Sequence, residues 1–184
     1  MVDEDVREYI AAKRMAADNL LGMRVGTPAA LPSNGEIRAA IVARSKLDPG
    51  FAYEARLAHM RRVAVQVMGV LDAFEPRLIG SVASGNIHRN SDLDLQLFCG
   101  REDELEHALR DAGYTFERIE HDVMKDGAFR RYVHYHFDAD GVPVELSVYD
   151  RKELSITRYS SVDGKPIDRV PRRRVEALLA AGRR

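Results

Sequence analysis

The hydrophobic period of this 184-residue chain changes near residue 76, and this change constrains the fold more than any other feature. Up to that point, apolar residues recur at the three- and four-residue spacing of amphipathic helices. Beyond it, apolar and polar residues alternate, as they do in half-buried strands. A helical region followed by a strand-rich region predicts an α+β fold. We therefore expect an N-terminal helical region (1–75), a core (76–150) and a C-terminal segment (151–184).

Three helices are expected in the N-terminal region. The first spans about 2–21. The second begins at Ser33-Asn34-Gly35-Glu36, which matches a capping box with serine at the N-cap and glutamate three residues later. The third runs from about 52 to 73. In the second helix, the positions that we expect to be buried are Ile37, Ala40 and Ile41.

The strands of the core are marked by alternation and by turn residues. A short strand is expected at 78–81, and residues 91–98 alternate strictly, with Leu93, Leu95 and Leu97 on one face and Asp92, Asp94 and Gln96 on the other. A short helix is expected at 102–112. Asp-Gly and Asp-Ala-Asp-Gly turns separate the segments that follow, which predicts antiparallel pairing. These last strands would be 114–124, 129–137 and 142–149, with a final short helix after Pro171.

Composition excludes several classes of protein. The 28 basic and 29 acidic residues nearly cancel, so the chain is not a generally basic nucleic-acid binder. A single cysteine, Cys99, excludes an intrachain disulfide, and its place after an apolar strand predicts a buried thiol. No apolar stretch approaches the roughly 18 residues of a membrane span. The N-terminus is acidic, whereas a signal peptide begins with basic residues that an apolar stretch follows. We therefore expect a cytoplasmic protein without a membrane partner.

Asp92 and Asp94 carry the first indication of chemistry. On a strand, their side chains project from the same face about 6–7 Å apart along the backbone. Two carboxylates that approach to about 4 Å repel each other by about 4 kcal/mol at an effective dielectric constant of 20. A hard cation such as Mg²⁺ offsets that repulsion and prefers oxygen ligands. The alternative is a solvent-facing strand that happens to carry two acids.

Gly80-Ser81 favours the metal-site interpretation. A Gly-Ser turn after a strand lets backbone N–H groups approach phosphate oxygens, and the serine hydroxyl adds a donor. Gly85 would relieve crowding in the same loop. The order apolar-Gly-Ser, a gap of about ten residues, then Asp-apolar-Asp-apolar is far more specific than an isolated Asp-x-Asp.

These residues resemble the DNA polymerase beta-like nucleotidyltransferase superfamily, and in particular its small, minimal bacterial members. The resemblance rests on Gly80-Ser81, Gly85 and Ser91-Asp92-Leu93-Asp94-Leu95; it covers about 77–99 and extends plausibly to Asp150. It implies a mixed, mostly antiparallel sheet of nucleotidyltransferase type with flanking helices. It also implies Mg²⁺, with Mn²⁺ as a substitute, in a two-metal site. The implied activity is transfer of a nucleoside monophosphate from an NTP, with ATP the first choice.

The same resemblance implies roles for individual residues. Asp92 and Asp94 would hold the metal, and a third carboxylate on a later strand would complete the site; Glu145 is the candidate, although the family more often has aspartate there. Gly80, Ser81 and Ser91 would bind the nucleotide phosphates. Small relatives often carry two arginines in the loop, but this chain has Ser84 and His88 at those positions, with Arg89 adjacent. The loop therefore lacks positive charge near the expected triphosphate.

Three weaker signals remain open. His134 and His136 share the polar face of a strand and can contact substrate, ligate metal or lie exposed. Arg130 and Arg131 can clamp phosphate or an anionic acceptor. Residues 165–184 hold seven basic and two acidic side chains, which can bind RNA or an acidic partner, or flank a helix that caps the sheet.

The expected enzyme modifies an unknown hydroxyl acceptor, with a protein or small molecule favoured over RNA. One alternative is a catalytically weak or inactive module of the same fold that senses nucleotides or binds a protein. A further alternative is an antitoxin-like protein that pairs with a helical toxin and modifies it.

Overall fold

The computed structural model describes residues 13, 15, 31–125, 128–160 and 164–182, with the side chains of 122–130 left out of the description. The helix expected at 2–21 therefore lies outside the described residues except at positions 13 and 15. The Arg130 side chain also lies outside them.

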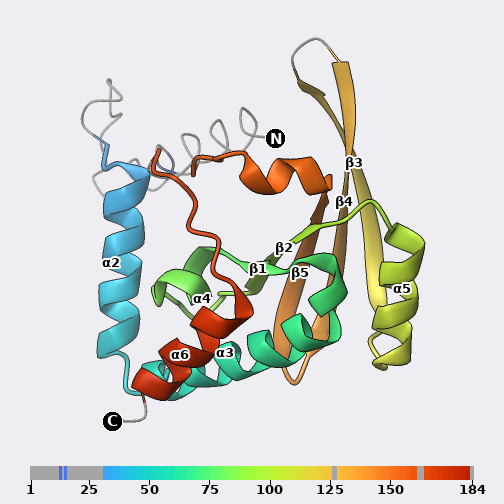
Figure 1. Cartoon of the computed structure of the whole chain (residues 1–184). Coiled ribbons are helices and arrows are strands. Elements are labelled where there is room, and N and C mark those ends of the chain that lie inside the picture. The colour runs from blue at the N-terminus through green and yellow to red at the C-terminus, as the bar shows by residue number, and fades with distance from the viewer. Residues whose placement is uncertain (1–12, 14, 16–30, 126–127, 161–163, 183–184) are drawn as a thin grey trace.

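A mixed sheet of five strands forms the centre of the described chain (Figure 1). Its strand order is β1-β2-β5-β4-β3. The pair β2–β5 is parallel and the other neighbouring pairs are antiparallel, which confirms a mixed, mostly antiparallel sheet. The strands are β1 (Arg77–Leu78), β2 (Leu93–Phe98), β3 (Phe116–Lys125), β4 (Ala128–Ala139) and β5 (Val142–Tyr149).

Helices flank this sheet, which confirms the α+β class. Pro171 stands at the N-cap of the last helix, and Gly113 follows the helix before β3 in the left-handed conformation, as expected after a helix end. The helices are α2 (Asn34–Leu47), α3 (Tyr53–Val70), α4 (Gly80–Ser84), α5 (Glu102–Asp111) and α6 (Arg172–Ala181), with 3₁₀ turns η2 (Asp72–Phe74) and η3 (Arg151–Ser155).

The short strand expected at 78–81, with a small-residue turn at its end, is present, but the strand itself is shorter than predicted. The strand stops at Leu78, because only Arg77 and Leu78 pair with β2, and α4 begins at Gly80. Gly80 turns the chain with a φ of 71°, a conformation that glycine adopts at little cost. The turn places the start of α4 directly beside β2.

The core lies between one face of the sheet and the helices. That face carries Leu93, Leu95 and Leu97, as predicted. Figure 1 shows α3 and α6 along one end of the sheet and α5 beside β3 and β4. The same buried cluster takes in side chains of α3, α5 and α6, namely Leu57, Met60, Val63, Ala64, Val67, Met68, Leu105, Leu109 and Val175.

Helix α2 begins as predicted but packs differently. The capping box is present: Ser33 N donates to Glu36 Oε2 at 2.7 Å, and Glu36 N donates to Ser33 Oγ at 3.2 Å. The expected burial of Ala40 and Ile41 was wrong, since both are exposed and only Val42 of this helix is buried. The physical reason is that α2 borders a cleft instead of lying flat on the sheet, so Ile37 and Ile41 line that cleft.

The C-terminal segment covers one end of the opposite sheet face. Arg169 Nε donates to Gln96 Oε1 at 2.8 Å, and its guanidinium lies 4.8 Å from the centre of the Phe98 ring. Arg158 stacks over Tyr149 at 4.4 Å and pairs with the buried Glu153. Two of the basic residues near the C-terminus therefore hold this segment on the sheet.

Among the described residues, no helix combines the length and the apolar character that crossing a bilayer requires.

A candidate metal centre beside a cleft

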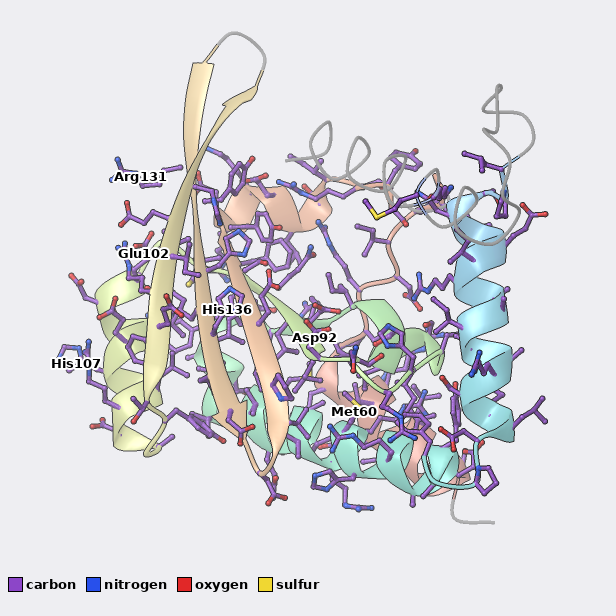
Figure 2. The ribbon with its side chains drawn as sticks, turned by 180° about the vertical axis from the view of Figure 1, so that it is seen from behind. Met60, Asp92, Glu102, His107, Arg131 and His136 are labelled. Carbon is purple, nitrogen blue, oxygen red and sulfur yellow. The ribbon has the colours of Figure 1, made fainter. Side chains whose placement is uncertain are left out.

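Three carboxylates converge where β2 and β5 run side by side. Asp92 immediately precedes β2, Asp94 lies within it, and the parallel register pairs Asp94 with Glu145 of β5. One oxygen from each carboxylate lies within 4.8 Å of the other two, so the three can hold a metal ion. Figure 2 shows Asp92 at the side of the sheet nearest α4, with His136 farther across the strands. The structure thus brings together the three residues that the sequence selected.

The carboxylate environment favours a cation. Burial, and then the charges of Asp92 and Glu145, raise the pKa of Asp94 to about 7, an effect that Arg38 partly offsets. A bound divalent ion would stabilise the ionised form of the Asp94 carboxylate against the negative charges of Asp92 and Glu145. In the absence of a cation, Asp94 is therefore half protonated near neutral pH.

Glu145 is held in the opposite state by its neighbours on β4 and β5. His134 Nδ1 lies 2.9 Å from Glu145 Oε1 and 3.1 Å from Ser147 Oγ. The hydrogen bond from His134, with the charges of His134 and His136, keeps the pKa of Glu145 below its ordinary value in spite of burial. Neither histidine belongs to the converging ligand group among the described residues. The exposed-strand alternative does not describe His134, because its side chain is largely buried and bonded to Glu145, a contact that none of the three expected roles included.

Gly80 and Ser81 stand directly against the acids. A Cβ at Gly80 would overlap Asp94 Oδ2, so only glycine leaves room for the carboxylate. Ser81 Oγ is buried and has no hydrogen-bond partner within the described part of the chain. A buried hydroxyl without a protein partner is uncommon and is available to hydrogen-bond a water molecule, an ion or a ligand.

Ser91 has a local structural role as well as a place in the site. Its side chain is buried, and its hydroxyl accepts a hydrogen bond from His88 N at 2.9 Å. This bond closes the turn that leads into β2 and so sets the position of Asp92. Ser91 also lines the cleft next to the acids.

A cleft of about 710 Å³ opens beside the carboxylates. Its walls come from α2, from α4 and the loop after it, and from the segment between η3 and α6. Gly80, Ser81, Ser91, Asp92 and Asp94 all line it. This volume lies within the range of small-molecule sites, which is about 300–1,000 Å³.

The cleft contains positive charge that local sequence reading missed. Ser84 and His88 line it, but Arg89 instead pairs with Asp48 at 2.6 Å. Two other cations line the cleft, Arg38 from α2 and Lys165 from the segment before α6. No motif marks either residue, because each reaches the cleft only through the tertiary fold.

The Arg131 prediction is not supported by its position. Arg131 pairs with Glu120 at 3.2 Å and shares the strand face of Val133, opposite to that of His134. It lines a separate cavity of about 400 Å³ near Cys99 and Tyr149. Cys99 itself is buried, as expected, and burial raises the pKa of its thiol.

Comparison with family models, with curated proteins and with solved structures gives no match, so the functional conclusion rests on the site alone.

Proposed function

We propose that the protein is a Mg²⁺-dependent nucleotidyltransferase, with a nucleotidyltransferase-type sheet, that moves a nucleoside monophosphate from an NTP to a hydroxyl acceptor. The observation that carries the proposal is the convergence of Asp92, Asp94 and Glu145 beside the Gly80-Ser81 turn. Three acids alone can be a metal site of many kinds. Their position against a phosphate-type turn and a ligand-sized cleft favours phosphoryl transfer.

The donor set fits a hard divalent cation. All three ligand groups are carboxylates, which Mg²⁺ and Mn²⁺ prefer, and the pKa of Asp94 is raised by burial and then by the charges of Asp92 and Glu145, which a cation would offset. When bound, one or two such ions neutralise charge on the phosphates and polarise the reacting oxygens. Asp92 and Asp94 would hold the ion nearer the triphosphate, and Glu145 would complete a second position.

The chain's own groups bind the triphosphate. The Ser81 hydroxyl, which has no partner among the described residues, donates to a phosphate oxygen. Arg38 supplies positive charge that the loop lacks at Ser84 and His88, and Lys165 also lines the cleft. These cations favour retained catalysis over an inactive module, because they stand where a polyanionic substrate needs them.

Glu145 faces the acceptor side of the site. His134 keeps its carboxylate ionised and fixed in orientation. The acceptor hydroxyl oxygen attacks the α-phosphorus, the bond from that phosphorus to the bridging oxygen breaks, and pyrophosphate leaves. Glu145 draws the hydroxyl proton toward its oxygens as the new phosphodiester bond forms.

We favour a protein or small-molecule acceptor over RNA, and ATP as the donor. RNA would bind through the basic C-terminal segment. Arg169 there contacts Gln96 and Phe98, and Arg172 pairs with Glu176 at 3.1 Å, so part of that charge serves the fold.

Label transfer tests the proposal. The protein is incubated with each α-labelled NTP, Mg²⁺ or Mn²⁺, and a cell extract, beside Asp92→Asn/Asp94→Asn and a control, Asp111→Asn, at an exposed acid of α5. Transfer by the wild type and Asp111→Asn but not by the double variant supports the proposal and identifies the acceptor. If no NTP binds or turns over with either metal, the proposal is wrong.

A further inference from the structure

The cleft beside the acids has an apolar, aromatic part that the chemistry of phosphoryl transfer does not explain. Exposed large hydrophobic side chains are few in the described chain, and two of them, Ile41 and Tyr159, line this cleft. Ile41 is 44% exposed and Tyr159 is 65% exposed. In the described part of the chain, these two side chains leave apolar surface in the wall of a polar cleft, which suits a ligand that has an uncharged part.

These two side chains come from elements that meet only in the folded chain. Ile41 lies on α2, one helical turn after Ile37, which also lines the cleft. Tyr159 lies in the segment after η3, which Figure 1 shows crossing to the N-terminal end of α2 before it returns to α6. Backbone contacts hold this segment in a hairpin-like turn: Tyr159 forms a bridge with Pro166, and Ile167 N donates to Arg158 O at 2.8 Å.

The polar and apolar parts of the cleft match the two halves of a nucleotide. Two of the acids and Ser81 line the cleft from the β2–α4 region, and Arg38 of α2 lies near enough to act on the pKa of Asp94, so a triphosphate and its metal would lie there. The segment of Tyr159 adds Lys165 and Asp168 to the same lining. The phenol ring of Tyr159 and the isoleucines of α2 remain for the part of the ligand that carries no charge. Aromatic rings bind bases by stacking at about 1–3 kcal/mol per base, with little selectivity for sequence.

We propose that Tyr159, with Ile41 and Ile37 of α2, forms the nucleobase subsite of the cleft. Tyr159 stacks on the base, and the α2 isoleucines cover its other side. This inference rests on the proposed function, since it assigns the base of the same NTP whose phosphates lie against Ser81. It makes the segment between η3 and α6 part of the substrate site, where the sequence had assigned it only basic character.

The affinities for two ligands, one with a base and one without, distinguish contacts to the base from contacts to the phosphates. Affinity in Mg²⁺ is measured by calorimetry for α,β-methylene-ATP and for inorganic tripolyphosphate. Wild type should bind the nucleotide more tightly than tripolyphosphate. Tyr159→Ala should weaken nucleotide binding about tenfold, a loss within the stacking range, and leave tripolyphosphate binding unchanged. Tyr159→Phe, which keeps the ring, should bind both as the wild type does.

Two matched controls test the assignment to these side chains. Ile156→Ala removes another exposed hydrophobic residue of the same segment, 46% exposed and absent from the cleft wall. Leu47→Ala does so on α2, where Leu47 is 82% exposed and also outside the cleft. Both control variants should bind the nucleotide and tripolyphosphate as the wild type does. Ile41→Ala should weaken binding of the nucleotide and leave binding of tripolyphosphate unchanged.

The possible failures are distinguishable. If the wild type binds neither ligand with Mg²⁺, the proposed function is wrong and the subsite with it. If the wild type binds the nucleotide but Tyr159→Ala leaves that affinity unchanged, or weakens nucleotide and tripolyphosphate equally, the subsite is wrong and the phosphate site stands.

Discussion

The carboxylate of Asp94 occupies the space in which a side chain at Gly80 would begin. Oδ2 of Asp94 lies too close to the position of a Cβ at Gly80 for both atoms to fit, and the φ of Gly80 is 71°. Strand β2 and the first residue of α4 therefore fit together only with glycine at this position. The close fit holds the Gly80-Ser81 turn directly against Asp94 of the candidate metal group.

Gly80→Ala should destabilise the protein and abolish metal binding. A left-handed alanine costs about 1 kcal/mol, and the added methyl group must also displace the Asp94 carboxylate. The matched control is Gly113→Ala, where φ is 84° and a Cβ meets no atom within 4 Å. Urea unfolding should show a lower free energy of unfolding for both variants, because both alanines are left-handed. The loss should be larger for Gly80→Ala. Equal losses with metal binding intact in both would contradict the Gly80–Asp94 fit.

Asp94→Asn should stabilise the metal-free protein at alkaline pH. The pKa of Asp94 is raised in the folded state, from 3.8 to about 7, so the folded state binds this proton more tightly than the unfolded state does. The stabilisation from this group is full below about pH 4 and is lost as pH rises toward 7. At pH 8 in EDTA, we expect Asp94→Asn to be more stable by about 2 kcal/mol, less than the full shift implies because Asp94 is only partly buried.

Unfolding measured across pH tests this sign. The free energy of unfolding of Asp94→Asn should exceed that of the wild type by an amount that grows from pH 4 to pH 8. A wild type that is more stable than the variant at pH 8 without metal would contradict it.

Mg²⁺ should raise the stability of the wild type and not of Asp92→Asn/Asp94→Asn. An ion that binds only the folded state adds RT ln(1 + [L]/Kd), about 1.4 kcal/mol at tenfold excess over Kd. Because protons compete for Asp94, the effect should weaken below pH 7. Thermal unfolding with and without Mg²⁺ at pH 6 and pH 8 measures both effects. An equal Mg²⁺ effect in the double variant would exclude these acids as ligands.

Arg38→Ala should weaken binding of the NTP more than it lowers turnover. Arg38 lines the cleft and its charge partly offsets the raised pKa of Asp94, so it lies near both the acids and the expected phosphates. We expect KM for the NTP to rise about tenfold, the scale of one charge-assisted hydrogen bond. Arg44→Ala, at an exposed arginine near the other end of α2, is the control and should leave KM unchanged. Equal KM values for the two variants would remove Arg38 from the site.

Local sequence patterns predicted the features that neighbouring residues determine, namely the faces of a strand and the pairing of strands joined by a short turn. Period-two alternation placed Asp94 opposite Leu93 and Leu95, and turn residues predicted the antiparallel pairing of β4 with β5. The parallel pairing that brings Glu145 to Asp94 joins distant segments and was not predicted; the family resemblance implied only that a third carboxylate on a later strand faces the first two. Periodicity gave an apolar stripe on α2 but not what the stripe faces, and so the predicted burial of Ile41 was wrong.

The same limit explains the residues that were missed. Arg38, Tyr159 and Lys165 reach the cleft from elements on either side of the Gly80-Ser81 turn in sequence. Each is an ordinary surface residue by type and spacing. Only the path of α2 and of the segment before α6 gives them a place beside the acids.

His134→Ala should lower turnover while leaving KM for the NTP nearly unchanged. His134 Nδ1 contacts Glu145 Oε1 at 2.9 Å, and His134 does not line the cleft of about 710 Å³, so its loss should free the Glu145 carboxylate without removing a contact to the proposed NTP. Partners that orient a ligand are typically worth about 10- to 100-fold in activity or metal affinity. The hydrogen bond from His134 is also the largest cause of the lowered pKa of Glu145, so its removal raises that pKa.

A pH profile separates this orienting role from a merely structural one. The acidic limb of kcat should move to higher pH in His134→Ala, because Glu145 then protonates more easily. His107→Ala is the matched control: His107 is on α5, where its Nδ1 lies 2.7 Å from Asp103 O, and it is remote from the acids. It should keep the wild-type kcat and the wild-type acidic limb. A His134→Ala variant with reduced kcat but an unmoved acidic limb would show that His134 supports the sheet without tuning Glu145.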